Sequence, residues 1–257
     1  MKVVLFCGGA GMRLRAYTED VPKPMVKIGA RPILWHLMKY YAHFGHKEFI
    51  LCLGYRGDVI KDYFLHYDES VSNNFVWSQG GKSIQYLNRD IDDWTITFVE
   101  TGMNANVGER LKAVEPYLNG EEMFLANYGD GLSDVPLPAV IENLQQSNAV
   151  VSLLLVQPTA SFDLVHAGPG GVVQQICPLI RSDIWINGGF FVMRKEIFRH
   201  IQPGEELLRE PFQRLIRKQA LVSYKYAGFW QCMDTFKDKQ HLEELEQTTA
   251  PWKVWEC

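Results

Sequence analysis

The sequence lacks the features that mark several large classes of protein. Its 257 residues carry a net charge of −4, so there is no overall excess of basic residues of the kind that binds nucleic acid. No stretch approaches the roughly 18 consecutive apolar residues of a membrane-spanning helix. The apolar run before Gly8 is too short for the core of a signal peptide. We therefore expect a protein that contacts neither nucleic acid nor a membrane.

Cysteine pairs and dividing segments are missing as well. The five cysteines are scattered and none forms a C-x-x-C pair, a pattern typical of reduced thiols. On this ground we expect a cytoplasmic protein. No internal repeat, low-complexity tract or Pro/Ser-rich linker divides the chain, so we expect a single domain over residues 1–257.

Strand and helix patterns alternate through the first half of the chain. Apolar runs predict strands over residues 2–6, 48–53, 83–88, 94–100, 123–128 and 149–157. Apolar residues at helical spacing predict helices over residues 32–45, 58–67, 108–118 and 137–146. This order is typical of an α/β fold in which helices flank a mostly parallel sheet.

From about residue 161 the pattern changes. Strands are predicted over residues 162–168, 171–176, 185–193, 221–228 and 229–233, and helices over 195–201, 205–220 and 236–247. We expect this second half to be a small β-rich and helical elaboration of the α/β domain.

A glycine-rich loop follows the first predicted strand. It is not a dinucleotide fingerprint, because Leu14 stands where the third glycine is needed, and it is not a P-loop, because Arg13 stands where a glycine is needed. It still has the ingredients of a phosphate site, since glycines let backbone N–H groups approach an anion and Arg13 and Lys23 supply positive charge. On the glycines alone, a turn with solvated cations is an equal alternative.

Several segments together resemble the sugar nucleotidyltransferases. The stretch "GGAGMRLR", followed by "PKPM", matches the family's G-G-x-G-T-R-L…P-K-P-M signature, and "NYGDGLSD", "INGGFFV", "GFWQCMDT" and "APWKVWE" continue the match. The resemblance covers nearly the whole chain, with a weak zone at residues 161–185. It is closest to the branch that transfers CMP from CTP to glucose 1-phosphate. It implies a Rossmann-like nucleotidyltransferase fold, with a nucleotide-binding half over about 1–160 and an acceptor-binding half over about 161–257, and a homo-oligomer.

The implied reaction is in-line attack by a phosphate oxygen of a sugar 1-phosphate on the α-phosphorus of CTP. Pyrophosphate leaves and a CDP-sugar is formed, which would be CDP-glucose if the acceptor is glucose 1-phosphate. A phosphate monoester is already largely ionised near neutral pH, so little general-base catalysis is needed. The difficulty is the repulsion between two polyanions, which explains a signature built on cations and metal-binding carboxylates.

The resemblance assigns roles to individual residues. Lys23, between two prolines, would contact substrate phosphates, and Arg13 would hold the leaving pyrophosphate. The residues implied for nucleotide binding are Gly8, Gly9, Ala10, Gly11, Thr101, Gly102, Gly108, Arg110 and Asp130. Asp130 and Asp234 would hold Mg²⁺ from separate strand ends, and Arg110 would donate to the cytosine carbonyl. The alternatives are a turn aspartate at Asp130, a helix N-cap at Asp234 and an ordinary helix charge at Arg110.

The acceptor side departs from the family pattern. Where the family carries F-x-E-K-P, this chain has Ile176, Cys177 and Pro178. An isoleucine cannot bind a sugar hydroxyl, and a neutral thiol cannot neutralise a phosphate. Arg181 could supply the missing charge, and the residues Asn187 and Gly188 of "INGGFF" would still meet the acceptor. A different phosphate or phosphonate acceptor is therefore one alternative. A non-catalytic nucleotide-binding protein is another, which the retained metal pair disfavours.

Overall fold

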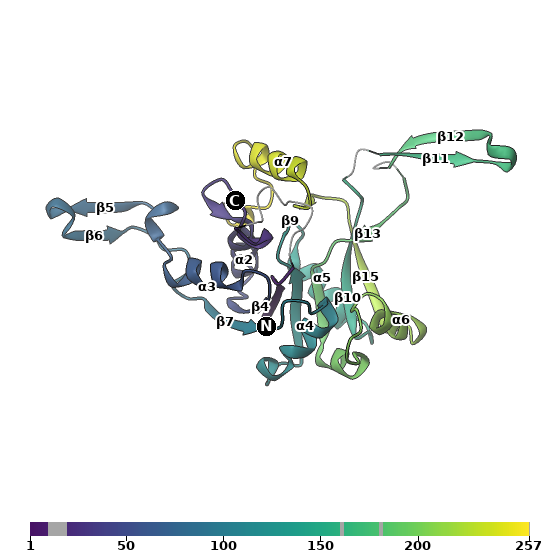
Figure 1. The fold of residues 1–257 in the computed structure, drawn as a ribbon, viewed down its shortest axis with the longest axis horizontal. Helices are drawn as coiled ribbons and strands as arrows, with labels where there is room; N and C mark the ends of the chain where they lie inside the picture. The colour runs from purple at the N-terminus through teal and green to yellow at the C-terminus, as the bar shows by residue number, and fades with distance from the viewer. Residues whose placement is uncertain (10–19, 160–161, 180–181, 257) are drawn as a thin grey trace.

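An eight-stranded mixed sheet forms the body of the protein in a computed structural model that describes residues 1–9, 20–159, 162–179 and 182–256 (Figure 1). Its strands are β1 (Val3–Phe6), β4 (Glu48–Leu53), β7 (Thr95–Glu100), β8 (Met123–Tyr128), β10 (Val151–Val156), β13 (Ile186–Asn187), β14 (Phe191–Arg194) and β15 (Leu221–Tyr226). Their order is β13-β10-β14-β8-β1-β4-β7, with β15 also paired to β10. The pairs β8–β1, β1–β4, β4–β7 and β10–β15 are parallel, whereas β14 is antiparallel to both β8 and β10. The predicted α/β class is confirmed.

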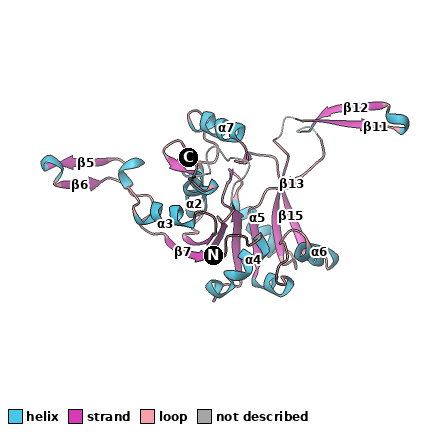
Figure 2. Cartoon of the chain, in the orientation of Figure 1, coloured by secondary structure: helices cyan, strands magenta, loops and turns pink. Residues whose placement is uncertain are grey.

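Helices pack on the sheet, and Figure 2 sets them apart from the strands by colour. The α-helices are α2 (Ile33–His43), α3 (Gly57–Leu65), α4 (Val107–Ala113), α5 (Leu137–Gln145), α6 (Glu210–Arg217) and α7 (Phe236–Glu246). Short 3₁₀ turns are η2 (Lys23–Met25), η3 (Glu69–Val71), η4 (Gln79–Gly81), η5 (Glu115–Leu118), η6 (Pro169–Gly171), η8 (Lys195–His200) and η9 (Val254–Glu256). Of the helices in the described ranges, none has the length and apolarity to cross a bilayer.

The core explains why the first strand reads as a continuous apolar run. Val3 and Leu5 pack into one buried cluster together with α2, α3 and α5, while Val4 and Phe6 pack into a second cluster with α4, η5 and α6. A strand covered on both faces needs apolar residues at successive positions, not at alternate ones. The parallel register of β1 with β8 then brings their carboxyl ends to one edge of the sheet, where ligands of open α/β sheets bind.

Four two-stranded sheets surround the main one. They are β2 (Lys27–Ile28) with β3 (Arg31–Pro32), β5 (Phe75–Ser78) with β6 (Ser83–Tyr86), β9 (Gly131–Ser133) with β16 (Trp230–Cys232), and β11 (Asp163–Ala167) with β12 (Val173–Pro178). Two of these, the β5–β6 and β11–β12 hairpins, extend from opposite ends of the body (Figure 1). The β9–β16 pair lies against the body and matters for the site.

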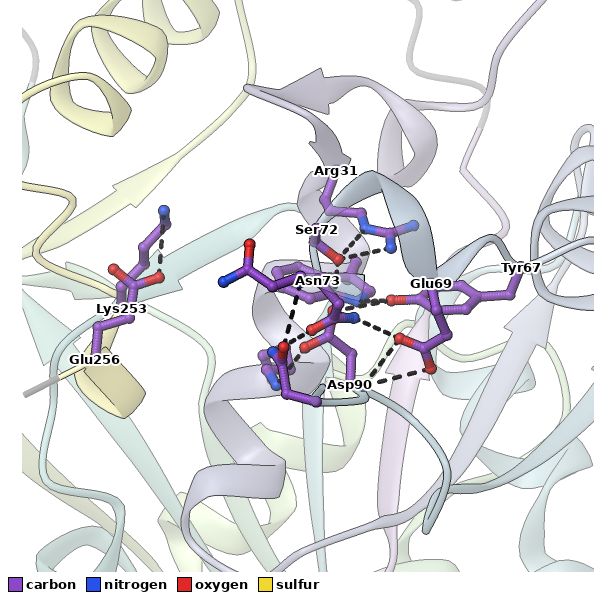
Figure 3. Close-up of polar contacts among 12 residues, drawn as sticks. Arg31, Tyr67, Glu69, Ser72, Asn73, Asp90, Lys253 and Glu256 are labelled. Carbon is purple, nitrogen blue, oxygen red and sulfur yellow. Dashed lines mark hydrogen bonds and ion pairs between the residues drawn. The ribbon is translucent and has the colours of Figure 1, made fainter. Parts of the chain in front are cut away.

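A buried polar network holds the segments on both sides of the β5–β6 hairpin (Figure 3). Arg31 is 3% exposed, and its Nη2 donates to the Asp68 carbonyl and to Ser72 Oγ, both at 2.7 Å. Beyond the hairpin, Asp90 accepts from Ser72 Oγ at 2.5 Å and from Asn73 Nδ2 at 2.9 Å. Buried charges are costly unless they are paired, so this network gives the base of the hairpin a defined place on the body.

Candidate active site

A cavity of about 420 Å³ opens beyond the carboxyl ends of β1 and β8. It is lined by six of the residues that the sequence singled out: Gly8, Gly9, Lys23, Arg110, Asp130 and Asp234. Phe6 and Tyr128, the last residues of the two strands, also contribute to its lining. The structure therefore brings the glycine turn, the proline-flanked lysine and both aspartates to one place, although they span most of the chain.

The pairing of β9 with β16 positions the two aspartates. Asp130 immediately precedes β9, and Asp234 follows β16 by two residues. In this antiparallel pair, Gly131 lies opposite Cys232, and the backbone N–H of Met233 donates to the Asp130 carbonyl at 2.9 Å. Two short strands far apart in sequence thus hold two carboxylates side by side. Asp234 also lies next to the start of α7, whose N-cap is the following residue, Thr235.

Lys23 lies between these carboxylates. Its Nζ forms ion pairs with Asp130 Oδ2 and with Asp234 Oδ1, the second at 2.5 Å. Its side chain is 13% exposed, against 21% for Asp130 and 35% for Asp234. Burial alone would lower the pKa of Lys23, but the two carboxylates outweigh it and the net pKa is raised. The lysine is therefore protonated and carries a positive charge at the edge of the cavity.

Cys232 contacts the same carboxylate without adding a charge. Its Sγ lies 3.8 Å from Asp234 Oδ2. Burial and the neighbouring carboxylates raise the pKa of this thiol to about 12, so it stays protonated at neutral pH. The protonated thiol therefore adds no negative charge beside Asp234.

Arg110 connects the ends of three strands through hydrogen bonds at the wall of the cavity. It is 4% exposed, and its guanidinium donates to the carbonyls of Gly8 at 3.0 Å, Leu53 at 3.1 Å and Gly102 at 2.9 Å, and to Thr101 Oγ1 at 2.7 Å. These acceptors follow or end β1, β4 and β7. We call this group, together with Gly54, the Arg110 cluster. Arg110 is thus a buried residue that holds backbone segments together, not an ordinary charge on a helix surface.

Two glycines make room for the guanidinium. A β-carbon on Gly8 would overlap Arg110 Nη1, and one on Gly54 would lie 2.7 Å from both Arg110 Nη1 and the Gly8 carbonyl oxygen. Gly9 is different, because a β-carbon there would meet no atom of the described residues within 4 Å. Close packing against Arg110 thus requires glycine at positions 8 and 54, whereas Gly9 faces open space in the cavity.

The remaining residues predicted for the nucleotide side support the cavity from behind. Thr101 Oγ1 donates to the Leu53 carbonyl at 2.7 Å and does not line the cavity. A β-carbon on Gly108 would overlap the Glu205 carbonyl oxygen, so this glycine lets two backbone segments approach. Glu109 forms a capping box with Asn106 that starts α4.

On the acceptor side, Asn187 and Gly188 lie one layer behind the cavity. Asn187 Nδ2 donates to the hydroxyl of Tyr128 at 3.2 Å, and Tyr128 lines the cavity. Gly188 packs on Val156, and its carbonyl accepts from Trp230 Nε1 at 2.8 Å. Asn187 therefore reaches the site through Tyr128, whereas the neighbours of Gly188, Val156 and Trp230, are not among the lining residues.

The stretch that replaces the family's acceptor motif lies elsewhere. Ile176, Cys177 and Pro178 belong to β12, in the hairpin that extends from the body (Figure 1), and Ile176 is 64% exposed. Within the described residues 162–179, none lines the cavity. The described part of this hairpin therefore does not contribute to the wall of the cavity.

Four predicted residues, Ala10, Gly11, Arg13 and Arg181, lie outside the described residues. Among the residues of the site that sequence reasoning missed are Gly54, Tyr128 and Glu206. Gly54 and Tyr128 had a signal, because each stands at the end of a predicted buried strand. Glu206 had no local signal, since it reaches the cavity only through the packing of residues 204–207 near α4.

The chain was compared with known proteins. The sequence pattern of the nucleotidyl transferase family matches residues 2–231. The chain is 38% identical to the glucose-1-phosphate cytidylyltransferase of Salmonella typhi over 259 residues, which covers 100% of both chains. Among solved structures, HddC from Yersinia pseudotuberculosis aligns with a TM-score of 0.66 at 19% identity, over 95% of this chain and 98% of that one. The inositol-1-phosphate CTP transferase from T. maritima aligns with a TM-score of 0.63 at 16% identity, over 96% of each chain.

Proposed function

The chain belongs to the nucleotidyl transferase family, and from this premise we propose that it transfers CMP from CTP to glucose 1-phosphate and releases pyrophosphate. One observation carries this proposal: Lys23, Asp130 and Asp234 meet at a cavity that begins at the glycine turn after β1. The choice of CTP and of glucose 1-phosphate is supported by a full-length relative that bears the name of this activity. We also propose that residues 1–257 form one domain, in which most of the nucleotide-binding residues come from about residues 1–160.

In the proposed reaction, an oxygen of the acceptor phosphate forms a bond to the α-phosphorus of CTP, and the bond from that phosphorus to the bridging oxygen of the β-phosphate breaks. The electron pair leaves with pyrophosphate, so no proton has to move in the displacement. Lys23 offsets the negative charge that two polyanions bring together, and the backbone at Gly8 and Gly9 lets the triphosphate approach. We assign Arg13 to the leaving pyrophosphate.

The residues present fit Mg²⁺. Asp130 and Asp234 already share one cation, the ammonium of Lys23, so both carboxylates reach a single position. No group of three or more acidic, histidine or cysteine side chains gathers anywhere in the described chain, which suits an ion that completes its shell with water and phosphate oxygens. Asp130 and Asp234 would hold Mg²⁺, which would supply positive charge against the substrate phosphates.

We propose that the Arg110 cluster selects the pyrimidine. By holding Gly8, Thr101 and Gly102 at fixed positions, Arg110 presents a rigid edge to the base. We also assign the contact with the cytosine carbonyl to Arg110. Gly108 supports the same segment by packing on residue 205.

The experiment is a pyrophosphate-release assay with Mg²⁺ and each nucleoside triphosphate in turn. Each triphosphate is offered glucose 1-phosphate, other sugar phosphates, phosphonates and further phosphomonoesters. We expect release with CTP and glucose 1-phosphate. Release with UTP or dTTP at equal rates would contradict the choice of base. Binding of CTP without release for any acceptor would support a non-catalytic protein instead.

A second acceptor class is favoured by one observation. The positions of the family's acceptor acid and lysine are Ile176 and Cys177 here, on an exposed hairpin. A CTP-dependent enzyme that uses a different phosphate or phosphonate acceptor is therefore the alternative, with Arg181, Asn187 and Gly188 assigned to acceptor binding. Release only with such an acceptor would identify it.

We also propose a cytoplasmic homo-oligomer. Large apolar side chains are exposed on both projecting hairpins, including Trp77 at 61% and Ile176 at 64%, and such surfaces are common at subunit contacts. The described cysteines are free thiols, as in a reducing compartment. Light scattering that finds only a 29.5 kDa species would remove the oligomer.

A further inference from the structure

We infer that Lys23 is an internal stand-in for the metal. Its ammonium occupies the cation position between Asp130 and Asp234 in the free protein and is exchanged for the metal when the nucleotide enters. This inference rests on the proposed function, because it concerns the metal pair of the same site. It assigns Lys23 two successive partners, the carboxylates first and the substrate phosphates second.

The geometry leaves no room for both cations. The Lys23 nitrogen contacts Asp130 Oδ2 directly and lies 2.5 Å from Asp234 Oδ1. A magnesium ion coordinated by both carboxylates would lie about 2.1 Å from an oxygen of each. The ammonium and the ion would therefore occupy nearly the same space, and two adjacent positive charges would also repel each other. Binding of the metal to this pair requires Lys23 to leave it.

The charges of the site predict when the exchange occurs. Without nucleotide, Lys23 cancels one of the two carboxylate charges, and Glu206 is the one further carboxylate among the described residues that line the cavity. A bound triphosphate changes this, because it supplies an anion to the lysine while the metal takes over the aspartates. Metal and nucleotide should then raise each other's affinity, as linkage requires. The free protein should bind metal weakly.

The test is a titration with Mn²⁺ alone, followed by calorimetry or electron paramagnetic resonance, on protein without nucleotide. We expect Lys23→Met to bind Mn²⁺ at least about tenfold more tightly than the wild type, because the ammonium no longer occupies the position between the two carboxylates or repels the ion. The control is Lys61→Met, which removes a positive charge from a surface pair with Glu100 and should not change Mn²⁺ binding. In a Lys23→Met/Asp130→Asn double variant the gain should disappear. Equal or weaker binding by Lys23→Met would overturn the inference.

A second measurement needs no variant. In crystals of the wild-type protein soaked with MnCl₂ and CTP, the anomalous signal should lie between Asp130 and Asp234, with the Lys23 ammonium moved away from both. A manganese peak with Lys23 still bridging the carboxylates, or one outside this pair, would refute the exchange. The proposed function is judged separately by pyrophosphate release: if release occurs but Lys23→Met shows no gain, the exchange alone is wrong. If the gain is seen without release, the function alone is wrong.

Discussion

The Arg110 cluster and the β11–β12 hairpin belong to the two sides of one proposed reaction, yet they are built in opposite ways. Arg110 is 4% exposed and is hydrogen-bonded to backbone at the ends of three parallel strands. Ile176, on the hairpin, is 64% exposed and lies away from the body (Figure 1). The position of the Arg110 cluster is thus fixed by the sheet. The segment that corresponds to the family's acceptor motif lies on a hairpin whose described residues do not line the cavity.

The largest effect on activity should come from replacing Asp130 or Asp234. We expect Asp130→Asn and Asp234→Asn each to lower kcat by at least about 100-fold, because the loss of one metal-binding charge removes stabilisation of the phosphoryl groups. Steady-state pyrophosphate release with CTP measures this. Asp62→Asn is the control, since that side chain is 74% exposed and lies on α3. A variant at position 130 or 234 with a near-normal rate would show that the metal pair has been misassigned.

A smaller effect is expected at the glycines, where Gly54→Ala and Gly9→Ala should differ in stability. Gly54→Ala places a methyl group 2.7 Å from the guanidinium of Arg110 and from the Gly8 carbonyl, so we expect a loss of about 1–3 kcal/mol in unfolding free energy and a raised KM for CTP. Chemical denaturation and steady-state kinetics measure the two changes. Gly9→Ala is the matched control for stability, because its methyl group would meet no atom of the described residues within 4 Å. Equal stability of the two variants would mean that the Arg110 cluster is not tightly packed.

These glycines also show what the sequence could and could not predict. The strands over 2–6, 48–53 and 123–128 were predicted because strands buried on both faces are continuous apolar runs, and each appears as β1, β4 or β8. The helix over 32–45 ends where Gly45 adopts a φ of +83°, a conformation that glycine favours. Local chemistry was enough in these places.

Prolines and long-range pairing account for most of the differences. The helix predicted over 108–118 divides into α4 and η5 next to Pro116, and the one predicted over 205–220 begins only at Glu210, with Pro211 in its first turn. The β9–β16 pair, which brings Asp130 to Asp234, joins residues about 100 positions apart, and no local pattern specifies such a partner. The residues of the metal pair could be predicted individually, but the contact of each with Lys23 could not.

Lowering the pH should reduce the unfolding free energy through the body of the protein, where His36 is buried, more than through the β11–β12 hairpin. Burial lowers the pKa of His36 to about 4, below its usual value near 6.5. As the pH falls below 6.5, the unfolded chain therefore binds a proton at this residue that the folded chain does not bind. We expect a loss of about 1 kcal/mol in unfolding free energy between pH 7.5 and 5.5 from this residue. Denaturation curves at several pH values measure it. His36→Gln should flatten the dependence in part, because His46 acts in the same direction. His166→Gln, on exposed β11, should leave it unchanged.

The smallest effect should come from Ile176→Glu. This side chain is largely in solvent, so the substitution should change the unfolding free energy by less than about 0.5 kcal/mol. The KM for CTP should stay the same, because no residue of the described hairpin lines the cavity that holds Lys23. Denaturation, kinetics with CTP and light scattering, run on one preparation, separate the possible results. A loss of the oligomer with an unchanged KM for CTP would place the hairpin in a subunit contact. A several-fold change in the KM for CTP in an intact oligomer would show that the two sides of the site are not independent.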